Sequence, residues 1–379
     1  ELYSLFFILV LTIVSAGFDL IGIGLIIPIL NIFVGNEFLE YLEFFNFFTY
    51  KSKNEIFLIL LFLLLLVYLL KFFITKSLIY NQNRFSHKLF TDISKLFFKK
   101  YLYQNYDFHL KKNSSELIRN VQTEVNLFVF GVVLQFVRLF SEIIMFVSIC
   151  IVLMIYEFSS SFLCIFIILF VGYILLKFTN DKLKKWGELR QYHSSLILKQ
   201  LRQAFSSIKE IIFNKLEDVF ISKYHNHNLI NAKAGRYKDT VTQLPRPIME
   251  LIGISTFIIL IVFLLETGKE ISEIFVIIGV FFFAATKLLP SVSKIVQSLQ
   301  SIKFNSSVVN LVYNQLIETN EKSRKKFDGE NKVDKNFNFK NIIFSGVNFR
   351  YSSGAKNILN NLNLEIKRGD KVGIIGKTG

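Results

Sequence analysis

Residues 56–75 read IFLILLFLLLLVYLLKFFIT, a run of twenty residues whose only charge is Lys71. A helix that crosses the hydrocarbon core of a membrane needs about 20 apolar residues, and this stretch meets that requirement. A mean hydropathy of +0.44 and 43 phenylalanines also place the chain among membrane proteins. Six stretches qualify as spans, covering residues 5–34, 56–80, 126–155, 161–179, 247–266 and 273–291.

Basic and acidic residues are concentrated in different loops. The long loops 81–124 and 177–246 carry eight and fourteen Lys or Arg against four and six acids. The short loops 35–55, 156–161 and 266–273 are instead rich in glutamate. Because cytoplasmic loops carry an excess of Lys and Arg, this alternation predicts that both basic loops and both termini are cytoplasmic. It also argues against a nucleic-acid partner, which would not require charge in alternate loops.

Only two cysteines occur, Cys150 and Cys164, and both lie inside apolar runs. This number and placement predict neither a disulfide framework nor a metal site.

The two basic loops keep apolar residues at helical spacing, as in NRFSHKLFTDISKLFFKKYLYQ (83–104), and contain no proline before Pro245. The simplest interpretation continues spans 2 to 5 into the cytoplasm as long helices. Twenty extra residues would reach about 30 Å beyond the membrane. The predicted fold class is therefore mainly α, a six-helix transmembrane bundle with long cytoplasmic helical extensions.

Between spans 1 and 2, EFLEYLEFFNFF (37–48) places glutamates at intervals of three with aromatic residues between them. The pattern is typical of a short amphipathic helix on the outer membrane surface. An aromatic belt at the interface explains it equally well.

After span 6 the helical pattern continues through residues 294–316, and a polar segment without periodicity follows. From 339 the apolar residues recur with period two, which predicts strands on either side of a slip at Gly346. Residues 368–370 (Arg-Gly-Asp) predict a turn, and 371–375 (KVGII) a short buried strand. A strand that runs into a glycine-rich turn is where a phosphate-binding loop belongs.

The glycine-rich turn contains only the front half of such a loop. A complete P-loop reads G-x-x-x-x-G-K-[ST], and the residue five before Gly376 is Lys371 rather than glycine. Gly376, Lys377, Thr378 and Gly379 instead match the first four positions of G-x-x-G-x-G-K-[ST]. Lys377 then occupies a variable position, and the lysine that holds the phosphates would follow Gly379.

Residues 347–379, VNFRYSSGAKNILNNLNLEIKRGDKVGIIGKTG, resemble the opening of an ABC-transporter ATPase domain. With six spans and two long intracellular loops, the whole chain resembles a type I (exporter-fold) ABC half-transporter. The resemblance implies a transmembrane domain at 1–315, a linker at 316–338 and the β-rich start of an α/β P-loop ATPase domain at 339–379. It also implies ATP with Mg²⁺, an ATPase activity whose catalytic residues lie outside this sequence, and a second half-transporter as partner, as a homodimer in the bacterial inner membrane. Tyr351 fills the place of the aromatic that stacks on adenine, unless it is an ordinary strand residue.

The same resemblance assigns the tips of the cytoplasmic loops. Tyr106, Asp107 and Phe108 match the first segment that couples the membrane domain to the ATPase, and Asn214, Lys215 and Glu217 match the second. Short transverse helices at these tips would press on the ATPase surface. Solvated helix bends are the alternative.

Ionisable residues inside spans are the usual markers of a substrate path. The candidates are Asp19, Lys71, Arg138, Glu142, Arg246 and Lys287. Arg138 and Glu142 are four residues apart on one helix, which predicts a mutually neutralising pair. For Lys71 and Lys287, helix packing or snorkelling toward water is an equal alternative.

Two stretches, LPRPIMELIGI (244–254) and KLLPSVSKI (287–295), resemble bacterial flippases of lipid-linked oligosaccharides. The resemblance implies a lipid-linked saccharide as cargo, with its pyrophosphate near Arg246 and, less directly, Lys71 and Lys287. The alternatives are an exporter of a peptide, a drug or a plain lipid, and a non-transporting membrane module with a degenerate nucleotide domain.

Overall fold

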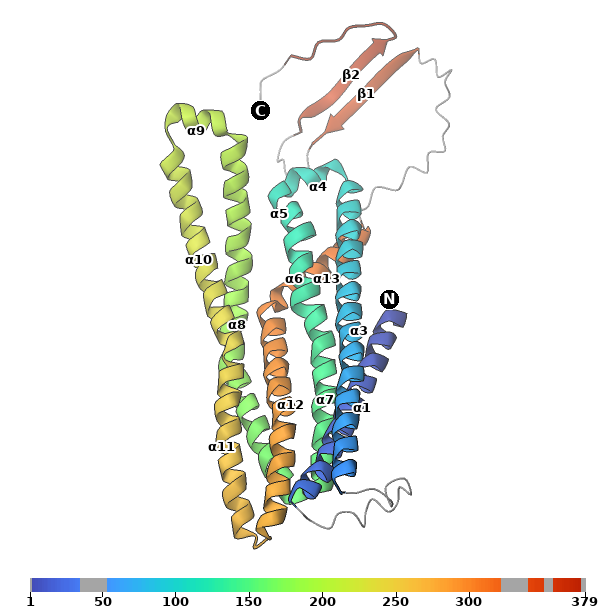
Figure 1. The fold of residues 1–379 in the computed structure, drawn as a ribbon. Coiled ribbons are helices and arrows are strands. Elements are labelled where there is room, and N and C mark those ends of the chain that lie inside the picture. Colours follow the sequence, from blue (N-terminus) through green and yellow to red (C-terminus); the bar gives the residue numbers. More distant parts are fainter. Residues whose placement is uncertain (1, 35–52, 322–339, 351–356, 376–379) are drawn as a thin grey trace.

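A computed structural model describes residues 2–34, 53–321, 340–350 and 357–375 (Figure 1). Within these ranges, six helical stretches are long and apolar enough to cross a membrane. They are Tyr3–Val34, Lys53–Leu102, Ser114–Tyr156, Phe158–Ser206, Glu217–Glu266 and Ile271–Phe304. Each contains one of the six predicted spans, so the mainly α fold class is confirmed. The predicted surface helix at 37–48 lies outside the described residues.

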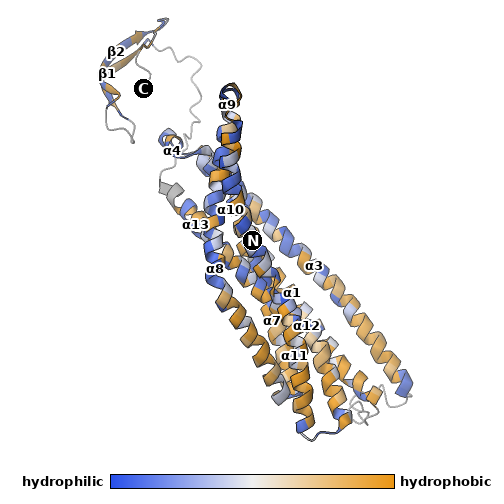
Figure 2. Ribbon diagram, turned by 90° about the vertical axis from the view of Figure 1, so that its left-hand side faces the viewer, coloured by the Kyte–Doolittle hydropathy of each residue, from blue (hydrophilic) through white to orange (hydrophobic). Residues whose placement is uncertain are grey.

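The predicted continuation of the spans into long helices is also confirmed. Helix α3 (Lys53–Leu102) has 50 residues and α8 (Phe158–Ser206) has 49, which at 1.5 Å per residue corresponds to about 75 Å. Helices α10 (Glu217–Gln243) and α11 (Pro245–Glu266) together form a third long element. Hydrophobic residues occupy one end of these long helices, and hydrophilic residues occupy the other end (Figure 2). This distribution is expected for membrane spans that continue into a polar medium.

The third span is assembled from shorter pieces. Helices α5 (Ser114–Arg119), α6 (Val125–Phe128) and α7 (Leu134–Tyr156) are joined by two π-helical turns, η1 (Asn120–Glu124) and η2 (Val129–Val133). Such turns insert an extra residue into the helical ladder and are frequent at functional sites. Nothing in the sequence pattern predicts them.

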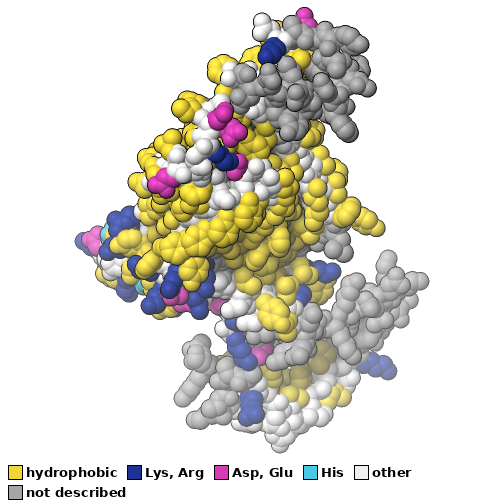
Figure 3. Space-filling model, turned by 90° about the horizontal axis from the view of Figure 1, so that it is seen from below, with side chains coloured by type: hydrophobic (Ala, Val, Ile, Leu, Met, Phe, Trp, Pro, Cys, Tyr) yellow, Lys and Arg dark blue, Asp and Glu magenta, His cyan; other side chains and the backbone are white. Residues whose placement is uncertain are grey.

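The core of the bundle surrounds α12 (Ile271–Phe304), which contacts α7, α8, α11 and α1 (Leu2–Val34). Its Ala284 is fully buried with Ile149 of α7 and Met249 of α11. The outer faces of the six helices instead expose large apolar side chains such as Leu58 and Phe166. Seen from the end where α11 turns into α12, hydrophobic side chains gather over the middle of the surface in view (Figure 3). Exposed apolar surface of this extent suits contact with lipid.

Helix α13 (Ser306–Glu321) follows α12 after a break at Asn305. The helical pattern predicted for 294–316 is therefore present, and α13 extends it to Glu321, into the range predicted as linker. Residues 322–339 lie outside the described part of the chain.

The predicted strands form an antiparallel pair, β1 (Asn341–Phe349) and β2 (Leu359–Lys367). The register shifts between the pairs Phe344↔Leu364 and Val347↔Leu362, and Gly346 has φ +59. The predicted slip is thus a β-bulge with glycine in the left-handed region, which glycine adopts at no steric cost.

The predicted turn at 368–370 is confirmed, with Gly369 at φ +94 and a hydrogen bond from the Asp370 amide to the Lys367 carbonyl. The predicted buried strand at 371–375 is wrong. These residues pair with neither β1 nor β2, and Ile374 and Ile375 are 93% and 99% exposed. A buried strand requires neighbours on its edges and faces, and the described residues supply none.

Candidate functional site

Two of the predicted path residues form a buried ion pair between helices. Asp19 of α1 contacts Lys71 of α3, and their side chains are 1% and 14% exposed. The second carboxylate oxygen of Asp19 is buried without a hydrogen-bond partner. Charges within a membrane span are costly unless paired, so this pair ties α1 to α3 and neutralises Lys71.

Tyr68 links this pair to a third predicted residue, Lys287 of α12. The Tyr68 ring centroid lies 5.8 Å from the Lys71 ammonium and 4.9 Å from the Lys287 ammonium, within range of a cation–π contact. The ring approaches α1 so closely that a Cβ at Gly22 would lie 3.0 Å from the Tyr68 hydroxyl. The structure therefore gathers Asp19, Lys71 and Lys287 around one aromatic ring, with two positive charges against one negative charge.

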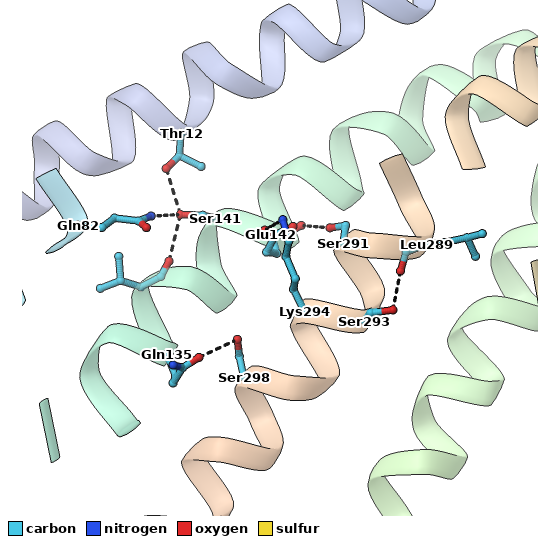
Figure 4. Close-up of polar contacts among 11 residues, drawn as sticks. Thr12, Gln82, Gln135, Ser141, Glu142, Leu289, Ser291, Ser293, Lys294 and Ser298 are labelled. Atoms are coloured by element: carbon cyan, nitrogen blue, oxygen red, sulfur yellow. Dashed lines mark hydrogen bonds and ion pairs between the residues drawn. The ribbon is translucent and has the colours of Figure 1, made fainter. Parts of the chain in front are cut away.

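The predicted neutralisation of Glu142 by Arg138 is wrong. A Glu142 carboxylate oxygen lies 2.8 Å from the Lys294 ammonium of α12 (Figure 4), and Arg138 forms no ion pair among the described residues. The physical reason is the position of Glu142, which faces α12. Its backbone carbonyl also accepts a hydrogen bond from the Ser291 hydroxyl there, at 3.1 Å.

Lys294 was not predicted as a path residue, although its spacing carried a signal. Lys287, Ser291, Lys294 and Ser298 recur at intervals of four, three and four, which places them on one face of α12. Figure 4 shows this face of α12 directed at α7, where Ser298 contacts the Gln135 side chain at 3.4 Å. A cavity of about 400 Å³, lined mostly by polar and charged residues, lies between α3, α7 and α12 and includes Arg138, Glu142 and Lys294 in its lining.

Arg246 lies apart from both groups. It is in the first turn of α11, where its Nε atom is 3.2 Å from a Glu250 carboxylate oxygen, and the two side chains are 79% and 62% exposed. Among the described residues no contact joins it to the Asp19 pair or to the cavity.

The predicted coupling residues lie at two chain reversals, which are at the same end of the molecule in Figure 1. The short helix α4 (Tyr106–Lys111) begins with Tyr106, Asp107 and Phe108. The ring of Phe108 stacks on that of Tyr101, with 6.1 Å between the ring centroids. Asp107 pairs with Lys111 at 2.9 Å, and Tyr106 is 69% exposed.

The second reversal contains the short helix α9 (Ile208–Asn214). Asn214 is its last residue, Lys215 turns the chain with φ 56, and Glu217 begins α10. Phe213, which was not predicted, is 87% exposed at this tip.

A buried charge cluster within these stalks was also missed. Glu124, in η1, is fully buried, 3.5 Å from the Arg119 guanidinium and 3.8 Å from that of Arg190 on α8. The Arg190 guanidinium lies 5.8 Å from the ring of Phe304, the last residue of α12. The cluster therefore joins the third span, α8 and the junction between α12 and α13.

Two close backbone approaches hold the same junction. A Cβ at Gly187 of α8 would lie 1.9 Å from the Phe304 carbonyl oxygen, and one at Gly131 of η2 would lie 2.5 Å from the Asn305 side chain. The Phe304 oxygen belongs to the backbone, so only glycine permits the approach at Gly187, whereas the Asn305 side chain could turn away from a Cβ at Gly131.

The predicted nucleotide-binding residues Tyr351, Gly376, Lys377, Thr378 and Gly379 lie outside the described residues. The β1–β2 hairpin that precedes the glycine-rich turn is the part of this region that the structure describes.

A family model of the ABC transporter transmembrane region matches residues 5–289. The chain belongs to this family. In an ABC transporter transmembrane region, the six apolar helices make the chain a multi-pass membrane protein. The match includes the predicted path and coupling residues but ends before Lys294.

Two curated relatives are ATP-binding translocation proteins by name. The leukotoxin translocation protein LktB of Mannheimia glucosida is 53% identical over 38 residues. The alpha-hemolysin translocation protein HlyB of Escherichia coli O157:H7 is 55% identical over 38 residues. In each case the matched stretch is 10% of this chain and 5% of the relative, so this ABC transporter chain aligns with only a small part of either protein.

Proposed function

We propose that the chain is the membrane half of an ATP-driven exporter that works with a second half-transporter, as a homodimer. The observation that carries this proposal is the charge group within the bundle. Asp19, Lys71 and Lys287 come from three different helices and leave a net positive charge at membrane depth. Such a group is costly in a purely structural bundle and useful on a path for an anionic cargo.

The long helices connect that group to the tips α4 and α9. ATP with Mg²⁺, bound partly through Tyr351 and Gly376–Gly379, would drive the ATPase domain against these tips. The residues in contact would be Tyr106, Asp107 and Phe108 on α4, and Asn214, Lys215 and Glu217 after α9. In this arrangement both termini and the stalks are cytoplasmic, and the bundle lies in a bacterial inner membrane.

The cargo we propose is a lipid-linked saccharide. Asp19 already neutralises Lys71, whereas Lys287 has no ion-pair partner among the described residues, so Lys287 is the better contact for a pyrophosphate. Arg246 would act at the entrance, because its side chain is exposed at the start of α11.

A polypeptide is the second candidate cargo, favoured by the names of the relatives HlyB and LktB. The test is ATP hydrolysis by the complete transporter in vesicles. A lipid-pyrophosphate saccharide should stimulate hydrolysis in the wild type and not in Lys287→Gln, whereas Lys184→Gln, exposed on the α8 stalk, should respond normally. Stimulation by polypeptides alone would replace the saccharide with the second candidate. ATP-independent binding without any transport would identify a non-transporting module.

A further inference from the structure

The cavity between α3, α7 and α12 has the composition of a binding site. Its volume of about 400 Å³ lies within the usual range for ligand pockets. Nine of its eleven lining residues are polar or charged, among them three glutamines. This is an unusual lining within a bundle whose helices are otherwise apolar enough to span a membrane.

The protein itself satisfies only part of this polar lining. One Glu142 oxygen pairs with Lys294, and Gln135 contacts Ser298. The other Glu142 oxygen is buried without a hydrogen-bond partner. Among the described residues, the Arg138 guanidinium, on an exposed side chain, and the half-buried Gln297 amide form no hydrogen bond or ion pair with the protein, so both are free to meet a ligand. A matching ligand therefore offers oxygen acceptors to Arg138 and Gln297, and a hydroxyl donor to Glu142.

The charge and geometry of the lining restrict the chemical class of the ligand further. Arg138 and Lys294 outweigh Glu142, so the lining has a net positive charge and favours an anion. The planar guanidinium of arginine matches the geometry of a phosphate with two parallel hydrogen bonds. The complementary group is a phosphate followed by hydroxyl groups.

The depth of the cavity points to a lipid as the source of that group. Arg138 lies nineteen residues before Glu157, where α7 turns into α8, which is about 29 Å along a helix. This is close to the thickness of the hydrocarbon core, about 30 Å, so the cavity lies level with the lipid headgroups on the side of the stalks.

An apolar groove next to the cavity supports the same source. The groove lies between α1 and α7, is lined by Ile8, Leu9 and Phe140 among others, and shares Ser141 with the cavity. At Ser141 the two spaces are separated by hydrogen bonds at 3.2 Å to Thr12 and to Gln82 (Figure 4). A polar space and an apolar space that meet at one residue suit an amphiphile.

We infer that this cavity binds the headgroup of an anionic membrane lipid whose phosphate is followed by hydroxyl groups, as in phosphatidylglycerol. Arg138 and Gln297 donate hydrogen bonds to the phosphate, and the free oxygen of Glu142 accepts one from a hydroxyl. Transport of this lipid, or of a cargo with the same headgroup chemistry, rests on the proposed export function. Binding of the lipid in the cavity does not depend on that function.

The test measures lipid binding without ATP. The complete transporter, in vesicles of phosphatidylcholine with a minor share of phosphatidylglycerol, is extracted and its retained lipids are identified by native mass spectrometry. The wild type should retain phosphatidylglycerol, and Arg138→Gln should reduce the retained amount at least about tenfold, the factor that corresponds to about 1.4 kcal/mol and a lower bound for the loss of a charged hydrogen bond. Arg84→Gln is the matched control, because it removes the same charge from a likewise exposed position on α3 that does not line the cavity.

Equal retention by Arg138→Gln and the wild type, or an equal loss in Arg84→Gln, would overturn the inference. Displacement of the lipid by an equal concentration of free glycerol phosphate would overturn the lipid as the source. Arg138 holds no ion pair within the described residues, so its substitution should leave folding intact, and an unchanged unfolding midpoint checks this. Selective lipid binding without ATP-driven transport would refute the export function alone, and polypeptide export without lipid binding would refute this site alone.

Discussion

Gly187 is the position at which a single methyl group should disturb the junction between the membrane bundle and α13. A Cβ at this position would lie 1.9 Å from the carbonyl oxygen of Phe304 and 2.9 Å from its carbonyl carbon. Both atoms belong to the backbone, so no side-chain rotation can relieve the overlap. A carbon and a carbonyl oxygen normally approach no closer than about 3.3 Å. In Gly187→Ala, α8 and the end of α12 must therefore separate by more than about 1 Å.

Two opposing terms set the expected size of the effect. Overpacking that shifts the backbone costs about 1–3 kcal/mol. Alanine regains about 1 kcal/mol over glycine in a helix interior. We therefore expect Gly187→Ala to destabilise the protein by up to about 2 kcal/mol. Gly235→Ala on α10 is the matched control, because a Cβ there would meet nothing within 4 Å. That variant should be more stable than the wild type by up to about 1 kcal/mol.

The assay uses a probe that the chain already contains. Trp186 is the only tryptophan in the sequence, is adjacent to Gly187 and stacks on Tyr237 of α10 at 5.2 Å. The midpoint of thermal unfolding, followed by its fluorescence in detergent, should fall in Gly187→Ala and rise in Gly235→Ala. A rise in both variants would refute the close approach of α8 to Phe304.

Three further substitutions test other parts of the structure by the same unfolding assay. Asp19→Asn should destabilise the protein by about 3–5 kcal/mol, since it leaves Lys71 buried without its partner, and adding Lys71→Gln should restore part of the loss. A double variant as unstable as the single one would argue against the pair. Glu124→Gln should cost a similar amount, about 3–5 kcal/mol, because two arginines lose their shared buried carboxylate, and an unchanged midpoint would contradict that. Phe213→Ser should change stability by less than about 0.5 kcal/mol, because the side chain is 87% exposed, but should abolish cargo-stimulated ATP hydrolysis if α9 couples the domains.

The spans, the stalks and the hairpin could be predicted because their signals are local. Apolar runs of sufficient length define the spans, and helical spacing without proline defines the stalks. The bulge at Gly346 was visible as a break in period two, and glycine is the residue that such a bulge requires. The prediction of a buried strand at 371–375 was wrong because an apolar run does not reveal whether a partner strand is present.

The partners within the candidate site could not be predicted, because they depend on which helix faces which. Glu142 has Arg138 at the spacing of a helical pair, yet it pairs with Lys294, which is 152 residues away in the sequence. The buried position of Glu124 and the close approach at Gly187 are likewise set by contacts between distant segments. A periodic pattern identifies which face of a helix is apolar or polar, but it does not identify the helix that packs against that face.

The hydroxyl contacts of α12 bear on how a movement at the stalks reaches the cavity. Ser291 and Ser301 donate hydrogen bonds to backbone carbonyls of the third span, at Glu142 and Gly131, and Ser298 contacts Gln135 between them. A sliding movement of α12 along this span would break all three contacts at once, so we expect the two to move as one body. Helix α3, by contrast, joins α7 at the cavity through the 3.2 Å contact of Gln82 with Ser141. Helix α13 is tied to α3 as well, because the Lys100 ammonium donates a hydrogen bond to the Leu316 carbonyl at 2.8 Å and Phe97 packs with Val308 and Val312. A displacement of α13 should therefore act on α3 directly and change the separation of α3 from the α7–α12 pair, and with it the space between Gln82 and Arg138.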